Sequence, residues 1–158
     1  MIFIANDHAG INLKNHISKH LESKNIPFIN LGVDTCDSVD YPDIAAILCK
    51  KVTEANSGDS EILNDSGNFS HDFNEKNIGI LICGSGIGMS IAANRHKSIR
   101  AALCNDSYSA IFARRHNDAN VLCLGERVVG VGLALSIVDV FLGETFEGGR
   151  HEKRVQKL

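Results

Sequence analysis

A cysteine stands at the entrance of a glycine-rich stretch in the middle of the chain. Cys83 is followed by Gly84, Gly86 and Gly88 in the run ICGSGIG, residues 82–88, and the apolar residues 91–93 then predict the start of a helix. Glycines let backbone N–H groups converge, and a helix that begins there adds partial positive charge, so the stretch could hold a phosphate, a carboxylate or a transient oxyanion. A thiol beside such a nest can act as a base or a nucleophile. A tight turn with a buried cysteine explains the stretch equally well.

The better-known glycine motifs do not match this stretch. In GSGIGM, residues 84–89, Met89 takes the place of the third glycine of a dinucleotide-binding G-x-G-x-x-G motif. The chain has no G-x-x-x-x-G-K-[ST] motif of a nucleotide P-loop. Ser85 has Cys83 and Ile87 where a nucleophile elbow has glycines. An anion-binding nest of another kind therefore stays open beside the plain turn.

Other polar residues stand next to predicted strands and helices. Asp7 and His8 follow the first apolar run directly, where Asp7 could also cap the next helix. Tyr41 precedes the second predicted helix, where its hydroxyl could reach a site or cap a loop. His116 and Asn117 lie between a helix and the last predicted strand, where a single histidine is usually a solvated loop residue.

Two arginines near the end of the sequence are four residues apart. Arg150 and Arg154, in GGRHEKR at 148–154, would share one face of a helix. Their forked guanidinium groups suit phosphate oxygens, and a dianion between them would offset their repulsion. A basic surface helix is the alternative. His16 and His20 are also four apart, but without an apparent third ligand they predict a solvated face rather than a metal site.

The elements that must position these side chains alternate along the chain. Short apolar runs predict five strands, and IGILICG is a continuous run of the kind found in covered parallel sheets. In the second predicted helix, the spacing places Ile44, Ile47, Leu48 and Val52 on the buried side. The predicted strands are 1–5, 26–32, 78–84, 99–104 and 119–125, and the best-marked helices are 10–25, 41–55 and 128–143.

This alternation predicts an α/β protein with a single doubly wound, Rossmann-like sheet of five parallel strands and helices on both faces. Ligands of such sheets bind outside the carboxyl ends of the strands, which would place 6–10, 83–88 and 105–106 on one rim. Residues 1–158 read as one domain. A stretch at about 56–77, with five acidic side chains against Lys76, predicts a polar surface insertion that chemistry does not need.

Composition excludes some classes of partner. A net charge of −3 with 22 % charged residues gives no general reason to expect nucleic acid or an anionic membrane. No apolar run approaches the roughly 20 residues of a membrane helix, and no secretory signal is visible. The five cysteines are odd in number and form no C-x-x-C pair, which favours reduced thiols in the cytoplasm.

Together these motifs closely resemble the ribose-5-phosphate isomerase B family and its sugar-phosphate isomerase relatives. The resemblance runs essentially from end to end, and the combination is specific although each motif alone is weak. The matching stretches are NDHAG at 6–10, DYPD at 40–43, ICGSGIGMSIAANR at 82–95, RRHNDANVL at 114–122, GERVVG at 125–130 and GGRHEKRV at 148–155.

The resemblance implies an enzyme that interconverts ribose 5-phosphate and ribulose 5-phosphate through an enediolate. Cys83 would be the base that moves a proton between C1 and C2, and the glycine loop with Ser85 would stabilise the enediolate. Some members carry a Glu at the position of Met89, so this chain resembles the cysteine type. His116 would open the sugar ring, and Asp7 would assist there or in proton exchange between oxygens.

The resemblance also implies how the substrate is held, with no metal and no organic cofactor. Family sites form between two subunits, which implies a homodimer or a dimer of dimers. The implied binding residues are Gly84, Gly86 and Gly88 in the loop, Tyr41 and Asn117 at hydroxyls or the oxyanion, and His8, Arg127, Arg150 and Arg154 at the phosphate.

Two other functions stay open from the sequence. The first is isomerisation of a six-carbon sugar phosphate, such as allose or galactose 6-phosphate, which the loops around Tyr41 and His116 would decide. The second is a catalytically silent phosphosugar-binding module, although phosphate binding alone does not require Cys83, Asp7 and His116 together.

Overall fold

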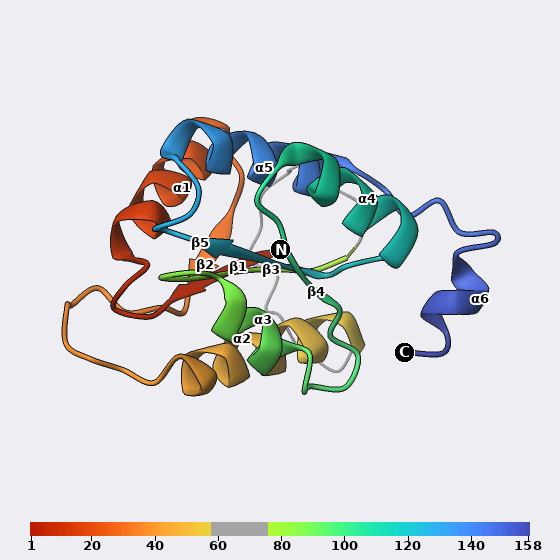
Figure 1. The fold of residues 1–158 in the computed structure, drawn as a ribbon, viewed down its shortest axis with the longest axis horizontal. Helices are drawn as coiled ribbons and strands as arrows, with labels where there is room; N and C mark the ends of the chain where they lie inside the picture. Colours follow the sequence, from red (N-terminus) through yellow and green to blue (C-terminus); the bar gives the residue numbers. More distant parts are fainter. Residues whose placement is uncertain (58–75) are drawn as a thin grey trace, which may run out of the picture.

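The computed structural model describes residues 1–57 and 76–158, and one sheet of five parallel strands forms its centre (Figure 1). The order across the sheet is β2-β1-β3-β5-β4, and every neighbouring pair is parallel. The predicted five-stranded doubly wound sheet is confirmed. The strands are β1 (Ile2–Asn6), β2 (Phe28–Asn30), β3 (Ile78–Cys83), β4 (Ala101–Leu103) and β5 (Val121–Gly125).

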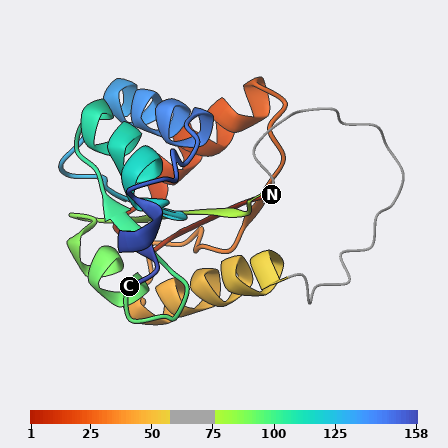
Figure 2. The ribbon, with the colours of Figure 1, turned by 90° about the vertical axis from the view of Figure 1, so that its right-hand side faces the viewer.

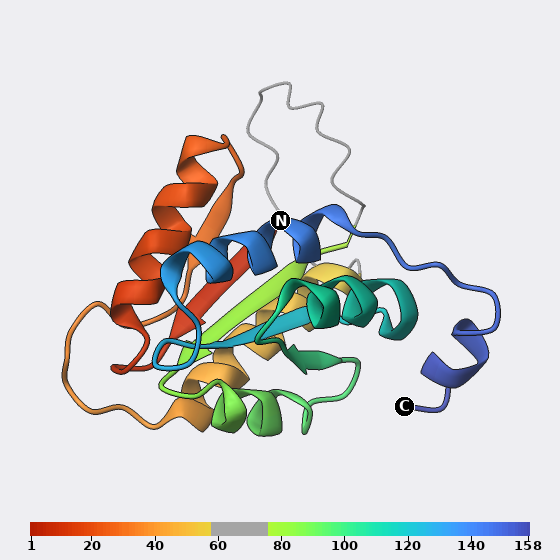
Figure 3. The ribbon, with the colours of Figure 1, turned by 45° about the horizontal axis from the view of Figure 1, so that its top comes forward.

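Helices cover both faces of the sheet (Figures 1 and 2). One face carries α1 (Ile11–Ser23), α4 (Ser107–Asn117) and α5 (Val131–Gly143), and the other carries α2 (Tyr41–Ser57) and α3 (Ile87–Ala93). The short α6 (Glu152–Val155) follows an irregular segment and stands away from the other helices (Figure 3). Among the helices of the two described ranges, none has the length and apolar character needed to cross a membrane.

Two apolar clusters, one on each face, hold the helices on the sheet. Every residue of β1, β3 and β5 is buried, because helices cover both sides. This explains why their sequences, apart from Asn6 at the end of β1, are continuous apolar runs and do not alternate. Leu13 and Ile17 of α1 pack on one face, and Leu48 and Val52 of α2 pack on the other. Burying one such side chain contributes about 1.5–3 kcal/mol.

Ile47 departs from the expected core. Its side chain is 48 % exposed, so its prediction as a buried residue of the second helix is wrong. Ile44, Leu48 and Val52 recur every four residues and form the buried stripe, while Ile47 lies beside this stripe on the outer surface.

The chain is tied together at residues 56 and 77, on either side of the undescribed range. Asn56 Nδ2 donates to the carbonyl of Asn77 at 3.0 Å, and the Asn77 N–H donates to Asn56 Oδ1 at 2.8 Å. Next to them, Lys76 Nζ donates to Asp118 Oδ2 at 2.7 Å. These contacts lie where β3 begins, at the edge of the sheet opposite the carboxyl ends. Most of the insertion predicted at 56–77 falls outside the described residues.

Candidate active site

Cys83 ends β3, and its sulfur accepts a hydrogen bond from the loop that follows. The Gly86 N–H lies 3.1 Å from Cys83 Sγ. Gly86 is the N-cap of α3 and has a φ of 76°, a left-handed conformation that glycine adopts without strain. An N–H group aimed at the sulfur can stabilise negative charge that develops there when the thiol gives up its proton.

The buried thiols outside this loop are suited to the core. Burial raises the pKa of Cys49 to about 12 and that of Cys104 to about 11. Burial also raises the pKa of Cys123 well above its usual value. These three cysteines are therefore neutral, apolar side chains near neutral pH. Within the two described ranges, Cys83 is the one cysteine whose sulfur accepts a backbone N–H.

The glycine loop lies tightly against its neighbours. A methyl group on Gly125 would come 2.6 Å from the carbonyl oxygen of Ser85, and one on Gly88 would come 2.8 Å from Tyr41 Cζ. Tyr41 therefore lies against the start of α3, next to the loop. A methyl group on Gly84 would meet the Arg127 guanidinium at an ordinary contact distance of 3.5 Å, so Arg127 borders the same loop.

The boundary of α3 differs from the predicted one. The helix begins at Ile87, four residues before Ile91, so Gly88 lies in the helix and the loop proper contains Gly84 and Gly86. Close packing against Tyr41 accounts for the glycine at position 88.

Asp7 and His8 form a turn between β1 and α1, beside the end of β3. The Asp7 N–H donates to the Ile82 carbonyl at 3.1 Å, and Asp7 Oδ1 accepts the Ala9 N–H at 2.9 Å. Gly10 is the N-cap of α1, so the interpretation of Asp7 as that cap is wrong. His8 Nδ1 accepts the Val39 N–H at 3.3 Å, which leaves Nε2 to carry the proton of a neutral ring.

His116 lies at the amino edge of the sheet, where the parallel strands begin, whereas Cys83 lies at the carboxyl edge, where they end. α4 begins next to the carboxyl end of β4 and runs back over 11 residues to Asn117, just before β5 begins. At a rise of ~1.5 Å per residue, this helix carries the chain about 16 Å across the sheet. His116, Asn117 and Arg154 line a pocket of about 310 Å³ at that edge.

The expected site residues therefore form two groups that do not meet within one chain. Those at the carboxyl edge come from the turn after β1, the glycine loop, the starts of α2 and α3, and the turn after β5. Those at the amino edge come from the end of α4 and the C-terminal segment. The first group comprises Asp7, His8, Tyr41, Cys83, Gly84, Ser85, Gly86, Gly88 and Arg127, and the second comprises His116, Asn117, Arg150 and Arg154.

Arg150 does not share a helix with Arg154. α6 begins at Glu152, because Gly148 and Gly149 turn the chain with φ values of 65° and 56° just before it. The predicted single helical face for both arginines is therefore wrong. Arg150 Nε donates instead to His151 Nε2 at 3.3 Å.

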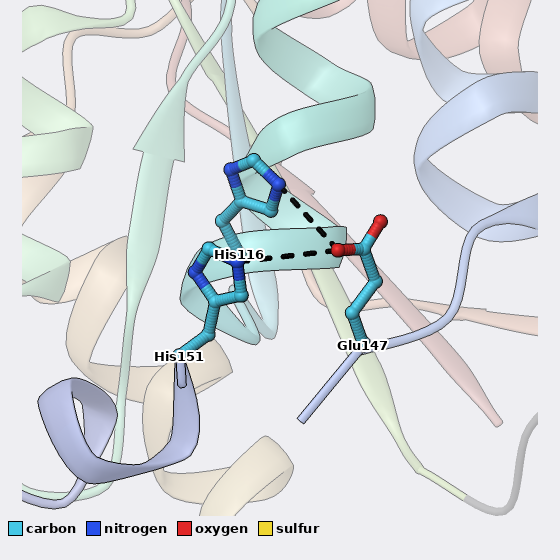
Figure 4. Close-up of side chains that lie close together, drawn as sticks. All are labelled: His116, Glu147 and His151. Atoms are coloured by element: carbon cyan, nitrogen blue, oxygen red, sulfur yellow. Dashed lines mark ion pairs between the residues drawn. The ribbon is translucent and has the colours of Figure 1, made fainter. Parts of the chain in front are cut away.

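Two further side chains join the amino-edge group (Figure 4). The rings of His116 and His151 are stacked, with centroids 4.0 Å apart and planes 8° from parallel. Glu147 Oε2 lies 3.6 Å from His116 Nε2 and 3.9 Å from His151 Nε2. Neither Glu147 nor His151 is among the side chains that the sequence predicts for the site. The acidic and imidazole groups four residues apart in FEGGRH were the available signal.

The sequence matches a family model and several curated proteins over nearly its whole length. The model of the Ribose/Galactose Isomerase family matches residues 2–68 and 69–158. The chain is 44 % identical over 158 residues to the probable ribose-5-phosphate isomerase B of Mycoplasma pneumoniae, covering 99 % of this chain and 91 % of that protein. It is 42 % identical over 152 residues to ribose-5-phosphate isomerase B of Escherichia coli, covering 96 % and 89 %.

A solved structure supports the same assignment. Ribose-5-phosphate isomerase B from Mycoplasma genitalium, solved with bound ribulose 5-phosphate, superposes with a TM-score of 0.84 at 43 % identity, covering 99 % of this chain and 91 % of that one. Sequence and fold thus agree from end to end. The chain belongs to the ribose/galactose isomerase family.

Proposed function

We propose that this protein interconverts ribose 5-phosphate and ribulose 5-phosphate, with Cys83 as the base. The Mycoplasma pneumoniae and Escherichia coli relatives, 44 % and 42 % identical, are named probable ribose-5-phosphate isomerase B and ribose-5-phosphate isomerase B. The 43 % identical structure from Mycoplasma genitalium was solved with ribulose 5-phosphate bound. The observation that carries the assignment of the base is the 3.1 Å hydrogen bond from the Gly86 N–H to Cys83 Sγ at the carboxyl edge of the sheet. Met89, at the position where some members carry a glutamate, is fully buried and has no group that accepts a proton.

The reaction needs one base that serves two adjacent carbons. The Cys83 thiolate takes the proton from C2 of the open-chain aldose, and the C2–H electron pair forms the C1=C2 bond of the enediolate. The thiol then returns the proton to C1, while a proton moves between the two oxygens, a transfer that we assign to Asp7. Backbone N–H groups of the loop with Ser85 stabilise the oxyanion in between. This chemistry moves protons within one substrate.

The loop geometry can be tested at Gly86. Replacing Gly86 with alanine is expected to lower kcat about 100-fold, the typical effect of losing one preorganised donor. A side chain is strained at a φ of 76° and would come 2.9 Å from the backbone carbon of Leu124, so the N–H must turn away from Cys83. Gly132→Ala is the control, because a methyl group there meets nothing within 4 Å. Steady-state kinetics of both variants test this prediction. An unchanged kcat for Gly86→Ala would contradict it.

We further propose that the active site is completed by a second copy of the chain. The proton-transfer group at Cys83 and the group around His116 lie at opposite edges of one sheet, so one chain cannot present both to one sugar. Ile87 and Ile91 on α3 are 53 % and 56 % exposed next to the glycine loop, and burying them against a partner removes apolar surface from water. A homodimer, alone or paired as a dimer of dimers, would unite the two groups.

At this shared site, we assign ring opening to His116 and phosphate binding to the arginines with His8. Tyr41 and Asn117 would bind hydroxyl groups. All five cysteines are free thiols, which agrees with a cytoplasmic enzyme.

The arginine assignment predicts a binding defect. Arg150→Ala and Arg154→Ala should each weaken phosphosugar binding about 10- to 100-fold, since a hydrogen bond to a charged group contributes about 1.5–3 kcal/mol. Calorimetric titration with a phosphorylated inhibitor measures this loss of affinity. Lys153→Ala, next to Arg154 on α6, is the control. Unchanged affinity in both arginine variants would place the phosphate elsewhere.

One assay tests the proposed function itself. Purified protein is expected to convert ribose 5-phosphate with a higher kcat/KM than allose 6-phosphate or galactose 6-phosphate. A preference for a six-carbon substrate would reassign the enzyme within its family. Phosphosugar binding without turnover of any of the three would indicate a binding module instead.

A further inference from the structure

The carboxylate of Glu147 lies beside two stacked imidazole rings at the amino edge of the sheet, within 4 Å of one nitrogen of each (Figure 4). Its Oε2 atom is 3.6 Å from His116 Nε2 and 3.9 Å from His151 Nε2. In the figure, the other nitrogen of the His116 ring, Nδ1, points away from Glu147. No hydrogen bond reaches Nδ1 from any residue that the structure describes.

The backbone holds Glu147 in this place. Arg115 on α4 forms a forked pair with Glu144, with Nε to Oε2 at 2.5 Å and Nη2 to Oε1 at 2.9 Å. The Glu147 N–H then donates to the carbonyl of Arg115 at 3.0 Å. The segment after α5 is therefore bound to the last turn of α4. This contact brings the Glu147 carboxylate next to His116, the residue that follows Arg115 in α4.

The geometry of the rings does not suit a metal ion. A zinc ion would need to lie about 2.0–2.1 Å from each coordinating nitrogen and near the plane of each ring, because the lone pair lies in that plane. The two rings are stacked 4.0 Å apart between centroids and are 8° from parallel, so an ion in one plane lies well out of the other. The cluster is better suited to one carboxylate shared by two rings.

The hydrogen bonds distinguish the two histidines. Arg150 Nε donates to His151 Nε2, so this nitrogen has no proton to offer Glu147. Burial lowers the pKa of His151 from its usual 6.5, and the positive charge of Arg150 acts in the same direction, so the uncharged ring is favoured. His151 is thus a flat, neutral surface under His116. Of the two rings, only His116 can present an Nε2–H to the carboxylate.

We propose that Glu147 is a positioning residue that selects the Nε2–H tautomer of His116 and leaves Nδ1 as the atom that exchanges protons with the substrate during ring opening. A carboxylate attracts an N–H and repels a bare lone pair, so it selects one tautomer, as carboxylates behind catalytic and metal-binding histidines do. The inference rests on the proposed function of His116 as the ring-opening group. Among the other charged groups here, Arg154 lines the same pocket and Arg150 is bound to His151.

Comparing the two directions of the reaction distinguishes a role of Glu147 in ring opening from a purely structural role. Ribose 5-phosphate closes into a furanose through its O4, and the ring must open before isomerisation. Ribulose 5-phosphate cannot close in this way, because the O5 atom that would attack C2 carries the phosphate. A defect confined to ring opening therefore slows the reaction that starts from ribose 5-phosphate and spares the one that starts from ribulose 5-phosphate.

The test compares Glu147→Gln with Glu152→Gln in the full-length protein. Glutamine keeps the size of the side chain but can accept from or donate to Nε2, so it no longer selects the tautomer. We expect kcat from ribose 5-phosphate to fall about tenfold, at the low end of losses for such supporting groups, with the initial rate from ribulose 5-phosphate nearly unchanged. Glu152 carries the same charge on the adjacent α6, is exposed and forms no ion pair with any described residue, so Glu152→Gln should retain both rates.

A second readout does not depend on turnover. Nitrogen NMR of protein labelled in histidine should show His116 as the Nε2–H tautomer in the parent protein and as a mixture in Glu147→Gln. Equal losses in both directions with an unchanged tautomer would overturn the inference and leave a structural role. Failure of the parent protein to isomerise either pentose phosphate would overturn the proposed function, whatever the tautomer.

Discussion

Replacing Cys83 with alanine is expected to lower kcat for ribose 5-phosphate by about 10³-fold, within the range that proton transfer by a placed side chain contributes. Phosphosugar binding should change little, because the phosphate is assigned to arginines and His8 and not to the thiol. Met89, at the position where some members carry a glutamate, is buried and cannot accept a proton, so it does not replace the lost base. Steady-state kinetics and calorimetric titration of one preparation measure both quantities.

Two further substitutions make this result specific. Cys83→Ser should be nearly as inactive, because a hydroxyl loses its proton far less readily than a thiol near neutral pH. Cys36→Ala removes an exposed thiol remote from the glycine loop in sequence and should retain full turnover. Near-native turnover of Cys83→Ala would show that another group moves the proton.

Mixing two inactive variants is expected to restore activity. Cys83→Ala and His116→Ala each damage every site of a homodimer, but at different edges of the sheet. If each site takes Cys83 from one chain and His116 from the other, a mixed dimer has one intact site and one site that lacks both groups. Random exchange makes half of the dimers mixed, so about a quarter of the parent activity should return, as expected for a two-fold symmetric interface.

The control for this mixing experiment uses two substitutions at the same edge. Cys83→Ala mixed with Gly86→Ala damages the carboxyl edge of both chains and should give no more than the sum of the separate rates. Co-expressed chains with different affinity tags allow the mixed dimer to be purified and assayed. A mixed dimer of Cys83→Ala and His116→Ala that stays inactive would contradict the shared site.

The sheet could be predicted because its three central strands leave an unmistakable sequence pattern. β1, β3 and β5 are buried on both faces, so each is a continuous apolar run between polar turns. The edge strands β2 and β4 have three residues each and pair on one side only, and their predicted bounds were too long. The α3 boundary was missed because Ile87 and Gly88 look like loop residues until Tyr41 is placed against them.

The placement of His116 and Cys83 at opposite edges of the sheet could have been inferred from the sequence. Cys83 ends a strand, whereas His116 comes just before one, and in a parallel sheet these positions lie at opposite edges. The contact between Glu147 and His116 could not be predicted from the sequence. It depends on the irregular segment after α5 lying back against α4, through Arg115 and Glu144, and no local pattern encodes that contact.

The pair formed by Asn56 and Asn77 has a practical consequence for protein engineering. Their reciprocal hydrogen bonds hold the end of α2 next to the start of β3. We therefore expect a change of sequence between these two residues to leave the rest of the fold unaltered. Lengthening a closed loop costs only about 0.6 kcal/mol per doubling. A fluorescent or affinity domain whose own ends lie close together can therefore be grafted between residues 57 and 76, provided that both asparagines and Lys76 are kept. The enzyme can then carry a second domain at the amino edge of the sheet, opposite the edge where Cys83 lies.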